Sequence, residues 1–137
     1  MIQLHILKGE TKIKLDNILN EILERSLAKG GGAILTYIGY VKTAKNKRKV
    51  KEFIIKIIDK EKLTNELKEI LKEKQCENLI DIRVYINTGR LKPGYPILYI
   101  IASSKTRKEL FTIVKELLEK IKTSKNIVKK DIFEDKG

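Results

Sequence analysis

The sequence predicts a single-domain α+β protein in which helices pack against a sheet. The chain has 137 residues, a length that favours one domain. It is 42% hydrophobic and 35% charged, a balance typical of globular proteins. Apolar residues alternate in some segments and recur at helical spacing in others, and these segments follow one another in the order βαββαββα.

Five segments rich in β-branched and apolar residues are predicted to be strands, namely residues 2–7, 33–41, 50–58, 80–86 and 95–102. In the fourth segment Asp81, Arg83 and Tyr85 share one face, and the apolar residues between them share the other. Because proline cannot donate to a β-ladder, Pro96 places the start of the fifth strand near a sheet edge. Residues 87–94 are expected to form a turn.

Three segments have the apolar spacing of amphipathic helices, namely residues 15–28, residues 60–74, and a segment that opens at Thr106 and ends near Lys122. Gly30 is expected to cap the first helix in the left-handed conformation. Asp59 is expected to cap the start of the second. Thr106 and Glu109 have the spacing of a capping box for the third.

Two segments have no clear periodicity. Residues 43–51 carry many like charges and no apolar anchor, so we expect a mobile basic loop that orders when a substrate or partner binds. Residues 123–137 form a mostly polar tail in which short apolar pairs are interspersed.

The net charge of +12 raises the alternative of a nucleic-acid-binding module. However, 25 of the 30 basic residues are lysines and five are arginines, whereas direct reading of bases favours arginine. Aromatic residues that could stack on bases make up 6% of the chain. Nucleic acid is therefore not the expected partner, although the basic segment 43–51 keeps this reading open.

The sequence lacks the residues or segments that several other functions require. No apolar run is long enough to span a membrane, and the N-terminus lacks the features of a signal peptide. The single cysteine, Cys76, cannot build a disulfide framework, so a reducing cytoplasm is the expected location. With one histidine and one cysteine, no metal site is predicted, and Gly30–Gly32 lacks the rest of a phosphate-binding loop.

Two short patterns in the middle of the chain have a fixed order. A Gly-Ala strand ends in an aromatic-x-Gly-x-Val-basic run, which extends from Tyr37 to Lys42. A Gly-x-Leu-x-x-Gly turn, from Gly89 to Gly94, then leads into an apolar strand and a serine pair.

The C-terminal part continues the same series. Thr106-Arg107 opens a helix that ends in Ile121-Lys122, and a second lysine, Lys129, follows seven residues later, before Lys130. Taken together with their spacings, these patterns resemble those of the large, catalytic subunit of molybdopterin synthase.

The resemblance implies an α/β hammerhead-like fold with an additional antiparallel sheet, assembled as a homodimer. It implies that sulfur passes from the thiocarboxylate of a small ubiquitin-like subunit to cyclic pyranopterin monophosphate, which gives molybdopterin. No metal or organic cofactor is implied for this step. The apolar strand near a sheet edge, residues 95–102, is a second reason to expect a homodimer, since a partner chain could cover it.

The resemblance also assigns roles to individual residues. Lys122 and Lys129 are the implied catalytic residues, and the tail 123–137 is therefore functional. Lys42, Thr106, Arg107 and Lys130 are the implied substrate-binding residues. We expect Lys122 to be partly desolvated among other cations and so to have a lowered pKa.

The family pattern is incomplete at some positions. Where the family has a His-Arg pair before the Gly-x-Leu-x-x-Gly turn, this chain has Ile86-Asn87, and where the family has arginine at the end of the Gly-Ala strand, it has Lys42. A non-catalytic relative that acts as a binding or scaffold protein therefore remains an alternative.

Overall fold

The computed structural model describes residues 2–9 and 12–135 and confirms the α+β class. The three predicted helices and five predicted strands are present. In chain order the elements are β1 (Ile2–Lys8), α1 (Leu15–Ala28), β2 (Ala33–Tyr40), β3 (Ala44–Lys45), β4 (Arg48–Ile57), α2 (Lys60–Glu73), β5 (Leu79–Leu91), β6 (Pro96–Ser104), α3 (Arg107–Thr123) and β7 (Ile127–Phe133).

The long strand β5 joins two parts of one sheet. Its first part pairs in parallel with β1 and antiparallel with β6, and β6 pairs in turn with β2. Its end, Gly89 to Leu91, pairs with β4, which also carries β3 and β7. Gly89 has a φ of +100°, which favours glycine, at the point where β5 passes from one part to the other. The part formed by β3, β4 and β7 is the additional antiparallel sheet that the resemblance implied.

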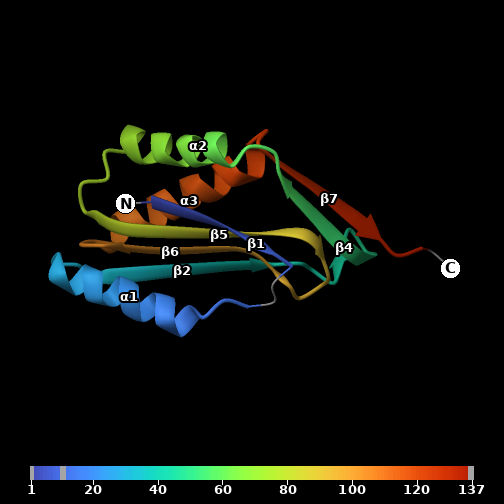
Figure 1. Cartoon of the computed structure of the whole chain (residues 1–137), viewed down its shortest axis with the longest axis horizontal. Coiled ribbons are helices and arrows are strands. Elements are labelled where there is room, and N and C mark those ends of the chain that lie inside the picture. The colour runs from blue at the N-terminus through green and yellow to red at the C-terminus, as the bar shows by residue number, and fades with distance from the viewer. Residues whose placement is uncertain (1, 10–11, 136–137) are drawn as a thin grey trace.

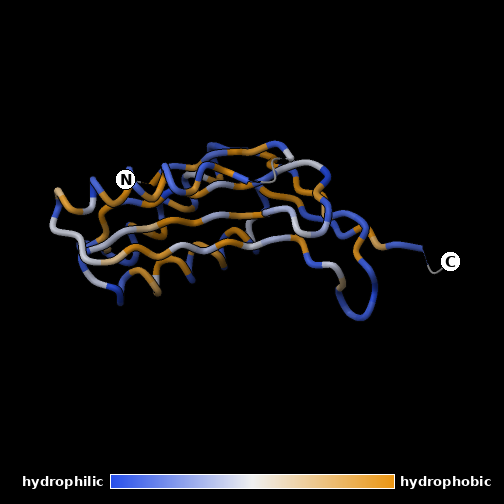
Figure 2. Tube along the Cα trace, turned by 90° about the horizontal axis from the view of Figure 1, so that it is seen from below, coloured by the Kyte–Doolittle hydropathy of each residue, from blue (hydrophilic) through white to orange (hydrophobic). Residues whose placement is uncertain are grey.

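Helices cover both faces of the main part of the sheet, with α1 on one face and α2 and α3 on the other, while β4 and β7 extend beyond them toward the C-terminus (Figure 1). The larger apolar core lies under α2 and α3, and a smaller one lies under α1. Hydrophobic residues lie along the strands, and hydrophilic residues lie on loops and outer turns (Figure 2). Burial of these two apolar faces drives the three-layer arrangement.

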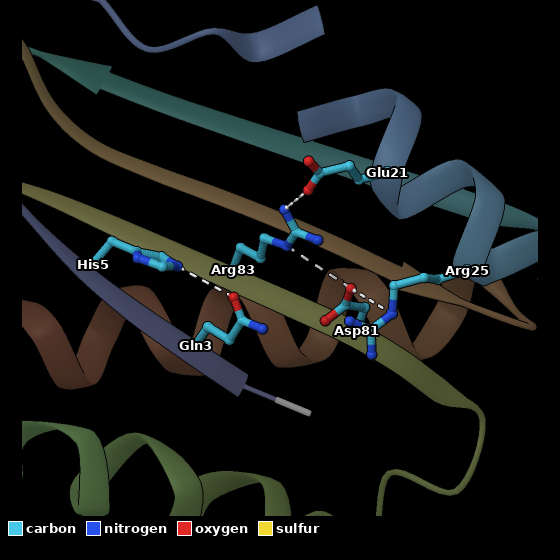
Figure 3. Close-up of polar contacts among 6 residues, drawn as sticks. All are labelled: Gln3, His5, Glu21, Arg25, Asp81 and Arg83. Carbon is cyan, nitrogen blue, oxygen red and sulfur yellow. Dashed lines mark hydrogen bonds and ion pairs between the residues drawn. The ribbon is translucent and has the colours of Figure 1, made fainter. Parts of the chain in front are cut away.

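The polar face of β5 is covered by α1 and carries a charged cluster (Figure 3). Asp81 is fully buried, and its Oδ2 lies 3.6 Å from Arg25 Nε and 3.9 Å from Arg83 Nε. Arg83 Nη1 donates a hydrogen bond of 2.7 Å to Glu21 on α1. These ion pairs fasten α1 to the sheet, because each buried charge would be costly without its partners.

Two of the three predicted helix caps are confirmed. The Asp59 carboxylate accepts a hydrogen bond from the Lys62 main-chain N–H. Gly30 follows α1 with a φ of +73°, in the left-handed region. The predicted capping box is wrong, because Thr106 makes no side-chain cap and Glu109 accepts a hydrogen bond from Asn78 N instead.

The expected position of the strand at residues 95–102 is also wrong. β6 lies in the interior of the sheet, between β2 and β5, and not at an edge. The lack of an N–H at Pro96 is accommodated at the strand's first residue, beside an irregularity in the pairing with β2. β2 takes the edge position, so the edge argument for a homodimer does not apply to residues 95–102.

Three segments expected to lack regular structure contain strands. Residues 87–91 continue β5, and the turn is confined to residues 92–95, because β4 supplies the pairing partner. In the basic segment, Ala44–Lys45 and the start of β4 form a hairpin rather than an irregular loop. The tail contains β7, which pairs with β4 over most of its length. The consecutive charged residues Lys129, Lys130 and Asp131 concealed the strand period of β7 in the sequence.

Candidate active site

The two lysines singled out in the sequence meet at the C-terminal end of α3. β7 runs antiparallel to β4, with Lys129 opposite Ile55. The Nζ of Lys129 donates hydrogen bonds to the main-chain carbonyl oxygens of Ile121, at 3.0 Å, and Lys122, at 3.1 Å. Lys129 therefore joins β7 to the end of the helix that carries Lys122.

A short connection between α3 and β7 makes this meeting possible. Ser124 ends the helix in an extended conformation, and its hydroxyl donates a hydrogen bond of 2.6 Å to Glu66 of α2. The side-chain amide of Asn126 donates to the same carboxylate oxygen, at 2.5 Å. Glu66 thereby holds the turn against α2, and the chain leaves it in the direction of β4.

Lys122 and Lys129 line one cavity of about 280 Å³, which we call the lysine hollow. It lies where the two parts of the sheet meet the end of α3. Its walls are mainly apolar, with Glu119 as the acidic member, and the full lining is Tyr37, Phe53, Ile55, Ile86, Ile97, Leu98, Leu118, Glu119, Ile121, Lys122, Ile127 and Lys129. Such walls strengthen electrostatic interactions with a bound anion.

We expected Lys122 to be the desolvated amine, but the structure buries the amine of Lys129 instead. Lys122 is exposed, whereas Lys129 is partly buried. Burial lowers the pKa of Lys129 below the ordinary value of 10.5, and the nearby charge of Lys122 lowers it further. A lysine in this setting releases its proton more readily than a solvated one.

A second, smaller cavity of about 140 Å³ adjoins the first, and we call it the hairpin hollow. It is lined by Tyr40, Val41, Lys42, Lys45, Val50, Phe53, Ile97 and Asp131. Phe53 and Ile97 line both cavities, so Lys42 lies beside the site of the lysine pair. Lys45 forms an ion pair of 3.0 Å with Asp131 in this wall.

Other residues with implied substrate-binding roles lie elsewhere in the chain. Thr106 and Arg107 are at the N-terminal end of α3, and fifteen residues of helix separate Arg107 from Lys122, a distance of about 22 Å. Lys130 lies opposite Ile54 on the other face of β7 and lines neither cavity. One chain thus brings together Lys122 and Lys129, places Lys42 nearby, and leaves Thr106, Arg107 and Lys130 apart.

Sequence reasoning missed several residues that line the two cavities. Tyr37, Phe53, Glu119, Lys45 and Asp131 are the clearest cases. Recognition of residues 127–133 as a strand would have placed Asp131 on the same face as Lys129. The contributions of β2 and β4 depend on pairings between distant segments, and no local pattern indicates them.

No group of three or more potential metal ligands from histidine, cysteine, aspartate and glutamate occurs within residues 2–9 and 12–135. Over the same residues, no helix combines the length and apolar character needed to cross a membrane.

Comparison with known proteins identifies the family. The profile of the MoaE protein family matches residues 9–124. This match extends from the end of β1 to the turn after α3 and includes Lys42, Thr106, Arg107 and Lys122. Lys129 and Lys130 lie beyond it. A sequence search of curated proteins finds no significant match.

Solved structures share the fold. A complex of subunits 1 and 2 of molybdopterin-converting factor from Helicobacter pylori matches with a TM-score of 0.73 and 19% identity, over 97% of this chain and 86% of the other. Molybdopterin synthase from Staphylococcus aureus matches with a TM-score of 0.74 and 21% identity, over 96% and 91% of the two chains. A MoaE protein from Burkholderia ambifaria matches with a TM-score of 0.71 and 16% identity, over 97% and 88%. Because the family profile spans most of its length, this chain belongs to the MoaE protein family, the family of the large, catalytic subunit of molybdopterin synthase.

Proposed function

We propose that this chain transfers sulfur to cyclic pyranopterin monophosphate from the thiocarboxylate of a small ubiquitin-like subunit. The observation that carries the proposal is the meeting of Lys122 and Lys129 in a cavity with apolar walls. The thiocarboxylate that delivers the sulfur is an anion, which paired lysines in a partly dry site would bind. We place the reaction in the cytoplasm, where the free thiol of Cys76 would stay reduced.

Lys129 is the better candidate for proton exchange. Burial favours its neutral form, while the two carbonyl oxygens at the end of α3 fix the position of its Nζ. A neutral amine that donates two hydrogen bonds to these carbonyls keeps its lone pair for a reacting group. Lys129 would thus take up or return a proton as sulfur adds to the pterin and oxygen leaves.

The main role of Lys122 would be to supply a positive charge that binds an anion. It is exposed at the mouth of the same cavity, so its side chain can follow an incoming anion. The C-terminal end of a helix also favours a cation at this position. We infer that Lys122 holds the thiocarboxylate tail of the small subunit near the substrate.

Arg107 would contribute through a second copy of the chain. A residue about 22 Å from Lys122 along the same helix cannot contact a ligand that is held at Lys122. In a symmetric dimer, however, Thr106 and Arg107 of one copy can approach the lysine hollow of the other. We therefore propose a homodimer in which each site contains residues of both copies.

The test is a reconstitution with purified components. The chain, a small Gly-Gly-ending subunit in thiocarboxylated form, and cyclic pyranopterin monophosphate are mixed for a single turnover, and sulfur in the pterin is measured by mass spectrometry. We expect sulfur to enter the pterin, and none to enter when the small subunit carries an ordinary carboxylate. If the components bind one another but no sulfur is transferred, the chain is a non-catalytic relative.

A further inference from the structure

We propose that Lys45 is a substrate-positioning residue that binds the anionic group of the substrate in the hairpin hollow. This inference rests on the proposed function and extends it to a residue outside the lysine pair. It assigns the hairpin hollow to the phosphate of the substrate and the adjoining lysine hollow to the part of the molecule that receives sulfur.

The strand register places the two cavities in one row. Lys129 lies opposite Ile55, and Asp131 lies opposite Phe53, so these four side chains share one face of the β4–β7 pair. Two residues of strand separate Lys129 from Asp131, a distance of about 7 Å. A flat fused-ring ligand with an anionic group at one end is long enough to reach from one cavity to the other.

The hairpin holds Lys45 beside this row. Asn46 and Lys47 form its two-residue turn with φ values of +53° and +64°, as a type I′ turn requires. Arg48 lies 4.0 Å above the ring of Phe133, which fastens the hairpin to β7. A defined turn, and not an irregular loop, therefore places Lys45 at the hairpin hollow.

The charge of the hollow favours an anion over a cation. Lys42 and Lys45 face one carboxylate, that of Asp131, so one positive charge is left uncompensated. The Lys45 side chain is 51% exposed and that of Asp131 is 24% exposed. Ion pairs with this degree of exposure contribute little to stability. Lys45 can therefore exchange Asp131 for a more highly charged ligand at low cost.

The hairpin also provides a matched control. Lys45 lies opposite Arg48, whereas Lys49 lies opposite Ala44, so Lys45 and Lys49 project from opposite faces of the hairpin. Lys49 is also an exposed lysine but does not line the hairpin hollow. A general effect of positive charge would appear with both residues, whereas positioning would appear with Lys45 alone.

The experiment measures equilibrium binding of cyclic pyranopterin monophosphate to the full chain without the small subunit, by calorimetry. Lys45→Met is expected to weaken binding about tenfold, the effect of a lost charge-assisted hydrogen bond. Lys45→Arg should stay within about twofold of wild type because it keeps the charge. Lys49→Met should behave like wild type. Inorganic phosphate should compete less effectively in Lys45→Met, and the loss should appear more in the substrate concentration that gives half-maximal transfer than in the rate at saturation.

Three outcomes would overturn the inference. Lys45→Met and Lys49→Met could weaken binding equally, which would indicate a general charge effect. Lys45→Met and Asp131→Asn could lower the Tm alike and leave the Kd unchanged, which would make the ion pair purely structural. The wild-type chain could also bind neither the substrate nor phosphate. If the wild type binds substrate but transfers no sulfur, the proposed function fails, and the binding comparison still decides the role of Lys45.

Discussion

The Nζ of Lys129 lies 3.1 Å from the main-chain carbonyl oxygen of Lys122 and donates a hydrogen bond to it. This contact joins two lysines that are seven residues apart, one at the end of α3 and one in β7. It fixes Lys129 through the backbone of Lys122, and it leaves the Lys122 side chain exposed at the mouth of the lysine hollow.

Removal of either lysine should impair sulfur transfer. Lys129→Ala is expected to lower the single-turnover rate by about 10²–10⁴-fold and to weaken substrate binding, because it removes the group that exchanges the proton. Lys122→Ala is expected to lower the rate by about 10–10²-fold with little change in Tm, because it removes an exposed charge that holds the thiocarboxylate. Lys120→Ala and Lys125→Ala, which change lysines outside the lysine hollow, should be near neutral. Equal effects of all four substitutions would mean that the site is wrongly assigned.

The lowered pKa of Lys129 predicts a pH dependence. If its neutral form exchanges the proton, the transfer rate should rise with pH through an apparent pKa below 10.5. Lys129→Met should abolish this rise, whereas Lys125→Met should leave it in place. A rate profile of the wild type that stays flat up to the pKa of ordinary lysine would contradict proton exchange by Lys129.

The same pKa has a consequence for stability. Between the lowered pKa and 10.5, Lys129 holds fewer protons in the folded state than in the unfolded state. The free energy of unfolding therefore increases as pH rises through that interval. Below the interval the buried charge is a cost. Urea unfolding of wild type and Lys129→Met should therefore show the largest advantage for Lys129→Met at neutral pH, and a smaller one toward pH 10.5.

Complementation should reveal a site shared between two copies. Lys122→Ala and Arg107→Ala are each expected to be inactive, but co-expressed chains should recover about one quarter of wild-type activity, because half of the dimers are mixed and each mixed dimer has one intact site. The control is a mixture of Lys122→Ala with Lys129→Ala, which lie in the same hollow and should not complement. Light scattering that finds only monomers at micromolar concentrations would exclude this arrangement.

The buried cluster under α1 should matter for stability. Arg83→Met is expected to lower the free energy of unfolding by about 3 kcal/mol, because it leaves the fully buried Asp81 with Arg25 as its remaining ion-pair partner. The double variant Asp81→Leu with Arg83→Leu should recover much of this loss, since it removes both charges. Chemical denaturation measures both effects, and a double variant less stable than Arg83→Met would contradict the argument.

The sequence by itself determined the helices, most of the strands and the family. Regular apolar spacing in residues 15–28 and 60–74 predicted α1 and α2, because burial of one face is enough to specify an amphipathic helix. Asp59 and Gly30 marked helix ends through local hydrogen bonds and backbone conformation. The seven-residue spacing of Lys122 and Lys129 was also evident from the sequence.

Only the tertiary structure decided which residues share a site. Lys129 and Asp131 occupy the positions of β7 that face the two cavities, so the period of the strand was hidden until β4 supplied the pairing partner. The burial of Lys129, rather than Lys122, depends on how α3, β4 and β7 meet, and this burial sets the direction of the pKa shift. Local sequence sets conformation, whereas desolvation and convergence arise from contacts between segments that are distant along the chain.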